Sequence, residues 1–226
     1  MPLNILYVTA TTAEGDILKN IPGIKKIPGG FVFGRHEITL LETGVGSIST
    51  AWGMAKWLSS NLKPDLAVNA GIAGSFRDDI KAGEVVMPVS DCFADAGIET
   101  GNDFVTLAEA GLVDKDKFPF TEGIIIADNK FVTLTSGYLR PVKAITVNTA
   151  SGTEVTIKKL IEKFNPDIET MEGATFFYIC SRENIPFLAL RAISNKVEPR
   201  DRGKWNIPLA LGNLSETLGR ILLMLE

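Results

Sequence analysis

The chain has 226 residues, enough to bury a sizeable core in a single α/β domain. Apolar residues make up 45% and charged residues 22%, a balance typical of globular proteins, and the net charge of −4 argues against nucleic acid as a partner. No apolar run approaches the roughly 20 residues of a membrane span, so no membrane partner is expected.

The few cysteines and the single histidine limit the chemistry further. Cys92 and Cys180 make no recognisable disulfide framework, so we expect reduced thiols in a cytoplasmic protein. The first residues, "MPLNILYVTATTAEG", have neither the basic flank nor the long apolar region of a signal peptide. One histidine, His36, and no clustered cysteines argue against a zinc site, and His36 is expected in a surface turn.

The first half of the chain alternates apolar runs with turn signals. Residues 3–10 predict a buried strand, and residues 11–18 a loop or helix. Residues 29–44 predict two strands around a turn at Gly34-Arg35. Residues 47–62 have apolar residues at helical spacing, closed by Lys63-Pro64. Trp52 and Trp57 on this helix are expected in the core or at an interface.

The remaining elements continue the alternation. Strands are expected within residues 65–76, 83–94, 144–151 and 187–195, the first of them running into a glycine-bearing turn at "NAGIAG". Helices are expected within residues 152–164, 174–185 and 206–226. This order predicts an α/β fold, a single domain over residues 1–226 with a largely parallel sheet. Ligands of such sheets gather at the carboxyl ends of the strands.

Polar residues follow several of these strands, and each has an ordinary structural explanation. Glu14 could be an acid in the first turn of a helix that interacts with the helix dipole. Glu172 could be an exposed acid on the surface of a helix. Asn195 is placed to cap the next segment. The glycines of "GVGSIS" make a weak phosphate-loop signal, because the third glycine of that motif is missing.

Taken together, the motifs resemble one known family. The segments "ETGVGSISTA", "PDLAVNAGIAGSF…GEVV" and "ETMEGA…IPFLALRAISN" occur in one order over nearly the whole chain. They resemble the nucleoside phosphorylase/nucleosidase superfamily, and within it the hydrolytic methylthioadenosine/S-adenosylhomocysteine nucleosidases and futalosine hydrolases. The resemblance implies a three-layer domain around a twisted mixed sheet, usually in a homo-oligomer, without metal or organic cofactor.

The family's chemistry cleaves the bond between the C1′ of a ribose and the N9 of a purine. By resemblance, Glu14 is the acid that activates water, Glu172 binds the ribose hydroxyls, and Asn195 recognises the base. Five other residues are expected near the substrate. Val155 and Thr156 would line the purine, Met171 would pack on the sugar, and Ser194 would support Asn195. The fifth is Gly74, at the end of the glycine-bearing segment. The tail "VEPRDRGKW" resembles that of futalosine hydrolases, whose substrate is an inosine-like nucleoside with a carboxyphenyl ketone at its 5′ end. Such a ligand needs a cation and an apolar slot in the protein. Arg200 and Arg202 are candidates for the cation, and Trp205 is a candidate for the slot. The segment "PRDRGK" also fits a solvated loop.

Two departures from the family's patterns bear on the reaction. Asn69 stands where one branch of the phosphorylases has a phosphate-gripping arginine, which favours water as the nucleophile. Adenine-specific nucleosidases have "ISD" where this chain has "ISN". An amide NH2 can donate to both N7 and O6 of hypoxanthine, whereas a carboxylate would repel O6; Asn also pairs with adenine, so it permits a 6-oxopurine without requiring one.

The resemblance therefore implies hydrolysis of futalosine with release of hypoxanthine, a reaction of menaquinone biosynthesis. The alternatives are a methylthioadenosine/S-adenosylhomocysteine nucleosidase and a phosphate-dependent 6-oxopurine nucleoside phosphorylase. A nucleoside-binding protein without turnover is the alternative from another class, and the presence of both Glu14 and Glu172 argues against it.

Overall fold

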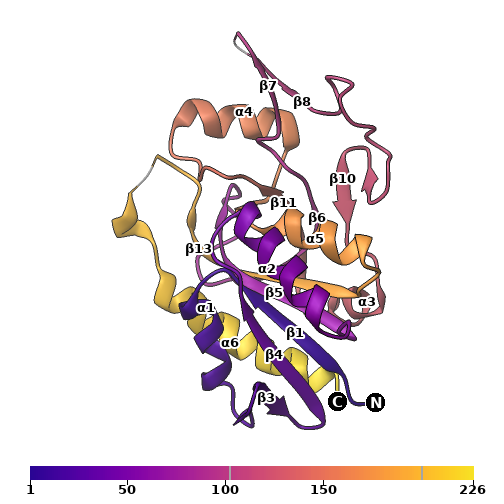
Figure 1. Ribbon diagram of the computed structural model, residues 1–226. Coiled ribbons are helices and arrows are strands. Elements are labelled where there is room, and N and C mark those ends of the chain that lie inside the picture. Colours follow the sequence, from indigo (N-terminus) through magenta and orange to yellow (C-terminus); the bar gives the residue numbers. More distant parts are fainter. Residues whose placement is uncertain (102, 200) are drawn as a thin grey trace.

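The computed structural model (Figure 1) describes residues 1–101, 103–199 and 201–226, with Arg202 described by its backbone alone. Its long central strands are β1 (Asn4–Thr9), β4 (His36–Glu42), β5 (Leu66–Ser75), β6 (Val85–Asp91), β11 (Arg140–Thr146) and β13 (Phe187–Lys196). Its main helices are α2 (Ser47–Ser60), α4 (Glu154–Phe164), α5 (Gly173–Arg182) and α6 (Ile207–Met224). These elements overlap the segments that the sequence predicts, although β11 spans Arg140–Thr146 where a strand was expected within residues 144–151.

Shorter elements complete the chain. Beside the long strands lie β2 (Lys25–Ile27), β3 (Gly30–Phe33), β9 (Phe120–Thr121), β10 (Ile124–Ile126) and β12 (Ile168–Thr170), and a separate hairpin pairs β7 (Gly97–Thr100) with β8 (Asp103–Thr106). The short helices are α1 (Thr12–Asp16), η1 (Ile17–Asn20), α3 (Lys130–Thr135) and η2 (Arg202–Lys204).

Apart from the β7–β8 hairpin, the described strands form one mixed sheet of eleven strands. Its order is β2-β3-β4-β1-β5-β12-β11-β6-β10-β9, and β13 pairs with both β5 and β6. The neighbours β4, β1, β5 and β13 are parallel, whereas β12 is antiparallel to β5 and β13 is antiparallel to β6. Because β13 bridges β5 and β6, the strands β5, β12, β11, β6 and β13 close a ring, so the sheet curls at this end.

Helices cover both faces of the sheet, as the alternation in β1 shows. Ile5 and Tyr7 pack in one apolar cluster with α6 and η1. Leu6 and Val8 pack in a second cluster with α2 and α5. Strands buried on both faces read as continuous apolar runs, which explains why they could be predicted. The mixed α/β architecture with a central sheet is confirmed.

Two local expectations were wrong. The segment "NAGIAG" is not a turn: β5 continues through it to Ser75, because its second half pairs with β13 on one side and β12 on the other. His36 is not on the surface but is the fully buried first residue of β4. Its Nδ1 accepts a hydrogen bond from the Leu3 amide at 3.1 Å, and burial lowers its pKa.

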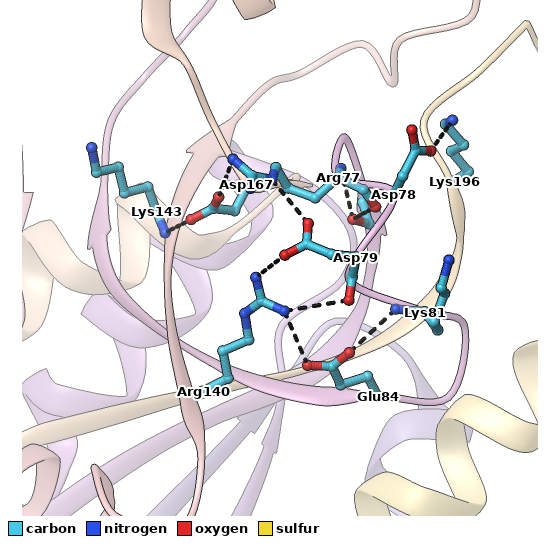
Figure 2. A network of polar contacts seen from close by, with 10 residues as sticks. Arg77, Asp78, Asp79, Lys81, Glu84, Arg140, Lys143, Asp167 and Lys196 are labelled. Carbon is cyan, nitrogen blue, oxygen red and sulfur yellow. Dashed lines mark hydrogen bonds and ion pairs between the residues drawn. The ribbon is translucent and has the colours of Figure 1, made fainter.

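An ion-pair network fixes the connection between β5 and β6 (Figure 2). Arg77 Nε donates to Asp79 Oδ1 at 3.1 Å, and Arg140 Nη2 from β11 lies 2.6 Å from Asp79 Oδ2. Lys196, the last residue of β13, pairs with Asp78. Exposed pairs of this kind contribute little stability individually. Together they fix the relative positions of two strands, because they link the first residue of β11 and the last residue of β13 to one loop.

Candidate active site

Glu14 lies at the carboxyl end of β1, buried against β5. Its Oε2 accepts hydrogen bonds from the Thr11 amide at 3.0 Å and the Thr11 hydroxyl at 2.8 Å, and Thr11 in turn caps α1. Its Oε1 accepts from the Ile72 amide at 3.0 Å. A Cβ on Gly71 would lie 2.5 Å from that oxygen, so the glycine is what lets the carboxylate approach β5. Three donors therefore hold the carboxylate in one orientation.

Glu172 is the residue that precedes α5, and its side chain reaches the loop before α2. Its Oε1 accepts a hydrogen bond from the Gly46 amide at 2.8 Å. Gly46 has a φ of +90°, a conformation that few other residues adopt. Burial raises the pKa of Glu172, while the Gly46 bond and the charge of Arg191 oppose the rise. Glu172 is thus a partly buried acid tied to a second segment, not a solvated helix acid.

Arg191 is a member of the site that the sequence interpretation missed. It lies in β13, where it is 2% exposed, and its Nη1 donates to the Asn69 carbonyl at 3.0 Å and the Leu190 carbonyl at 2.9 Å. Its Nη2 donates to Asn69 Oδ1. An arginine inside the apolar run "LALRAIS" was a usable signal, because arginine is almost never fully buried without partners.

The charge of Arg191 is balanced by acids from several elements. Burial lowers its pKa, but the negative charges of Glu172, Glu14 and Asp91 favour its charged form. A buried guanidinium among three carboxylates is costly to assemble unless the geometry satisfies it. Perturbed, buried charges gathered at strand ends are typical of functional sites.

Asp91, at the end of β6, is a second residue that was not predicted. It is 1% exposed, and its Oδ1 accepts from the Thr146 hydroxyl at 3.0 Å. Its Oδ2 has no hydrogen-bond partner among the described residues and lies under the start of α5, where a Cβ on Gly173 would come within 2.1 Å. Burial raises the pKa of Asp91 to about 7.

Asn195 lies near the end of β13, opposite Gly74 of β5. Its Oδ1 accepts a hydrogen bond from the Ser194 hydroxyl at 2.7 Å, and its Nδ2 donates to the Lys196 carbonyl at 2.8 Å. A Cβ on Gly74 would lie 3.3 Å from Asn195 Nδ2. The strand register thus brings Ser194, Asn195 and Gly74 together.

The remaining predicted residues are spread around these groups. Met171 is half-buried and directly precedes Glu172. Val155 and Thr156 lie in the first turn of α4 and are exposed, and the Thr156 amide is capped by the Thr153 hydroxyl at 3.2 Å. Trp205 is half-buried beyond η2. Arg200 and the side chain of Arg202 lie outside the described residues.

Glu14 follows β1, Glu172 follows β12, and Arg191 and Asn195 lie in β13. These polar groups define the class of protein: an α/β protein with a candidate polar site beside its central sheet. The particular family follows from comparison with known proteins. The chain belongs to the Phosphorylase superfamily, whose family model matches residues 5–223.

Relatives known from their sequences cover nearly the whole chain. It is 30% identical to the futalosine hydrolase of Streptomyces coelicolor, over 99% of this chain and 97% of the relative. It is 26% identical to the 5′-methylthioadenosine/S-adenosylhomocysteine nucleosidase of Listeria welshimeri, over 85% of this chain and 86% of the relative.

Solved structures share the fold. A 5′-methylthioadenosine/S-adenosylhomocysteine nucleosidase from S. pneumoniae, solved with a transition-state inhibitor, superposes with a TM-score of 0.80 at 19% identity, over 99% of this chain and 100% of that one. Futalosine hydrolase of Helicobacter pylori superposes with a TM-score of 0.76 at 16% identity, over 97% of each chain. The predicted family and fold are confirmed.

Proposed function

We propose that this chain is a purine nucleosidase, a single domain over residues 1–226, that hydrolyses the N-glycosidic bond of futalosine and releases hypoxanthine. The similarity to curated futalosine hydrolases over the full chain supports the activity. The observation that carries the mechanism is the placement of Glu14 and Glu172 around Arg191 of β13, the strand that also carries Asn195 near its end. Hydrolysis of futalosine would place the reaction in menaquinone biosynthesis.

Glu14 is the general base in this proposal. A water oxygen attacks C1′, the C1′–N9 bond breaks, and its electron pair moves onto the purine. The proton of the water passes to Glu14, whose orientation is fixed by Thr11 and Ile72. Held by three donors, the carboxylate needs no reorganisation when the water arrives.

Glu172 binds the ribose. The Gly46 amide occupies its Oε1, and the acceptor capacity of its Oε2 serves the sugar hydroxyls. As the sugar becomes cationic in the transition state, its hydroxyls become better donors, and the bonds to a carboxylate strengthen. Met171, which directly precedes Glu172 in the chain, packs on the sugar.

Asn195 recognises the purine. Ser194 donates to its Oδ1, so the Nδ2 donors face away from Ser194, and one of them is used by the Lys196 carbonyl. The second N–H is left for N7 or O6 of a 6-oxopurine. Because an amide cannot deliver a proton, Asn195 stabilises the leaving base by hydrogen bonding alone.

Water is preferred to phosphate as nucleophile because the buried cation of the site is already occupied. Asn69 stands at the position of the phosphorylase arginine, and its side chain and carbonyl both accept from Arg191. Arg191 also faces Glu14, Glu172 and Asp91, so its charge is already shared among acids before any phosphate is added. A phosphate-dependent rate would favour the phosphorylase alternative.

The 5′ group is assigned to the tail that follows β13. Trp205 supplies an apolar surface, and Arg200 and Arg202 supply the cation for the carboxylate. The free, buried thiols Cys92 and Cys180 fit a reducing, cytoplasmic location. Within the described residues no helix is long and apolar enough to span a membrane.

Homo-oligomerisation is part of the proposal and rests on one face of α2. Ile48 and Trp52, one helical turn apart, are 84% and 69% exposed, and Val45 just before the helix is 54% exposed. A contiguous apolar surface of this kind is typical of an interface. It adjoins Gly46, so a second copy would lie beside the ribose end of the site.

The experiment is a panel of inosine, futalosine, methylthioadenosine and adenosylhomocysteine, each with and without phosphate. We expect hypoxanthine release from futalosine at a rate that phosphate does not change. Adenine release from methylthioadenosine would support the related nucleosidase instead. Tight binding with no released base would establish a nucleoside-binding protein.

A further inference from the structure

Asp91 is a buried acid that the mechanism above does not use. It is the last residue of β6 and is 1% exposed. Its Oδ1 accepts a hydrogen bond from the Thr146 hydroxyl at 3.0 Å. Its Oδ2 lies against the first residue of α5, because a Cβ on Gly173 would come within 2.1 Å of that oxygen. Burying a carboxyl group costs free energy, so the presence of this acid calls for a reason.

The Thr146 hydroxyl connects Asp91 to the start of α5. Thr146 is the fully buried last residue of β11, and its Oγ1 accepts a hydrogen bond from the Ala174 amide at 2.7 Å. It also lies 3.1 Å from the Oγ1 of Thr170, the last residue of β12, which accepts from the Gly173 amide at 3.3 Å. Gly173 and Ala174 begin α5, where amides have no acceptor within the helix. Side chains from two neighbouring strands therefore cap this helix.

The hydroxyl protons give this hydroxyl network, made of Asp91, Thr146 and Thr170, a direction. Each threonine hydroxyl has one proton to donate. Thr146 donates its proton to Asp91 Oδ1, so Thr170 is the donor in the bond between the two hydroxyls. Both hydroxyls then accept from the amides of α5, and every proton has an acceptor. Without the acceptor at Asp91, one buried hydroxyl proton would have no partner, which is destabilising.

This capping has a consequence for Glu172. Glu172 occupies the N-cap position of α5, and its side chain makes no capping hydrogen bond. Its carbonyl accepts the first hydrogen bond of the helix, from the Phe176 amide at 3.0 Å. Its carboxylate instead reaches the Gly46 amide at 2.8 Å. Because other residues cap the helix, the carboxylate is free to leave the helix end, and its position follows that of the first turn of α5.

We propose that Asp91 is a positioning residue for the proposed reaction: through Thr146 and Thr170 it fixes the first turn of α5, and thereby holds Glu172 where its carboxylate binds the ribose. The inference rests on the proposed function and extends it to a residue that touches no substrate atom. It accounts for the buried acid, since Asp91 is the acceptor at which the hydroxyl network ends. A displaced Glu172 would lose the bonds to the sugar hydroxyls that strengthen in the transition state.

Single substitutions test whether the hydroxyl network matters. Asp91→Ala removes the final acceptor, and Thr146→Val removes the central hydroxyl at nearly constant size. Each should lower kcat/KM for futalosine about tenfold, with most of the loss in kcat, because the bonds of Glu172 are strongest in the transition state. Thr146→Ser restores the hydroxyl and should recover activity to within about threefold of the wild type. A Thr146→Ser variant as impaired as Thr146→Val would overturn the inference.

Thr135→Val is the matched control. Thr135 is also fully buried, in α3, and its hydroxyl donates to the Phe131 carbonyl at 2.9 Å. The substitution makes the same chemical change outside the hydroxyl network, so kcat/KM should stay at the wild-type value, while thermal unfolding measures any loss of stability. If Thr135→Val and Thr146→Val lost activity equally, the loss would reflect stability alone, and the inference would be wrong.

A double-mutant cycle separates positioning from general stability. The effect of Asp91→Ala on kcat/KM is measured in the wild-type background and in Glu172→Gln. If Asp91 acts through Glu172, its removal should cost less than about twofold once the carboxylate is gone. A residue with only a structural role would lower the rate by the same factor in both backgrounds, and that result would contradict the inference.

Amide hydrogen exchange, measured by NMR, needs no turnover. The Gly46 amide is protected by Glu172, and the first two amides of α5 are protected by the threonine hydroxyls. Asp91→Ala should speed the exchange of all of them about tenfold, whereas Thr135→Val should not. Thr146→Val provides the same measurement if Asp91→Ala does not fold. Unchanged protection of the Gly46 amide in a folded variant would overturn the inference.

The two hypotheses fail separately. If no nucleoside is hydrolysed but Asp91→Ala speeds the exchange of the Gly46 amide, the nucleosidase proposal falls and the positioning of Glu172 by Asp91 stands. If futalosine is hydrolysed while that amide stays protected, Asp91 has only a structural role.

Discussion

Glu14 illustrates how much of the proposed chemistry depends on one orientation. Its two oxygens have different partners, Ile72 on one side and Thr11 on the other. An acid that only balanced a helix dipole would need neither. The bond to Ile72 links the acid to the strand that also carries Gly74, so the proposed base and the proposed purine site share one support.

Glu14→Gln tests the base. Glutamine keeps the size and one acceptor oxygen but cannot take a proton from water, so kcat for futalosine should fall about 10²- to 10⁴-fold with little change in ligand binding. Initial rates of purine release measure kcat, and calorimetry measures binding. A kcat equal to that of the wild type would rule out Glu14 as the base.

Asn195→Asp tests base recognition. A carboxylate at this position repels O6 of a 6-oxopurine and accepts from the amine of adenine, so the preference should move toward 6-amino nucleosides. The ratio of kcat/KM for futalosine and its 6-amino analogue measures the change. No shift in this ratio would show that Asn195 does not face the base.

Asp91→Asn tests stability against pH. The pKa of Asp91 is raised from 3.8 to about 7, so the folded state holds this proton more tightly than the unfolded state. The resulting stabilisation is fully present below pH 3.8 and is lost as pH rises toward 7. Relative to the wild type, the free energy of unfolding of the variant should rise between these limits by up to about 1.4 kcal/mol per pH unit. Urea unfolding at a series of pH values measures it, and parallel curves would contradict the shift.

At the scale of elements, the loop before α2 joins Glu172, the acid proposed to bind the ribose, to that helix. Gly46 has a positive φ and donates to Glu172. Gly29, in the turn between β2 and β3, has a similar φ of +86°. A Cβ added at either glycine would meet no described atom within 4 Å, so neither position is crowded. The two glycines therefore share a backbone requirement but differ in what they contact.

Gly46→Ala and Gly29→Ala make a matched pair. Each should cost about 1–3 kcal/mol of stability, because alanine is strained at a positive φ of this kind. Only Gly46→Ala should also lower kcat/KM, by about tenfold, since its amide holds the Glu172 carboxylate. Thermal unfolding and rates on futalosine measure the two effects. Equal activity in both variants would mean that the Gly46 bond does not position Glu172.

The elements that could be predicted from the sequence are those whose pattern is local. β1, β5 and β13 are long apolar runs, and α4 and α6 have helical periodicity with polar caps. β12, by contrast, has three residues and follows an Asn-Pro pair, so nothing in its sequence separates it from a loop. It forms because β5 and β11 each offer it a partner.

The candidate site divides in the same way. Glu14, Glu172 and Asn195 could be proposed because each follows a recognisable segment. Asp91 could not, since its importance depends on which strands lie side by side, and strand order is a long-range property. Arg191 left a signal of residue type, an arginine in an apolar run, but its partners Glu14, Glu172 and Asp91 come from other elements. The roles of all five residues remain predictions.

For the whole molecule, the exposed face of α2 predicts association. Trp52→Glu should turn an oligomer into a monomer, because it places a charge in the centre of an apolar interface. Leu223→Glu is the control: Leu223 is 64% exposed on α6, which packs in the apolar cluster on the other face of the sheet from α2. Sedimentation at several concentrations measures the state of each. A wild type that is monomeric at all concentrations would remove α2 as an interface.

The long strand β5 has a consequence for how this molecule can change. Along ten residues it presents Asn69 to Arg191, Gly71 and Ile72 to Glu14, and Gly74 to Asn195 and Glu169. These positions are spaced by the fixed rise of a strand, so inserting or deleting one residue would displace three sites together. Natural variants of this protein should therefore differ in β5 by replacement and never by length, with changes of length confined to connections such as residues 107–119.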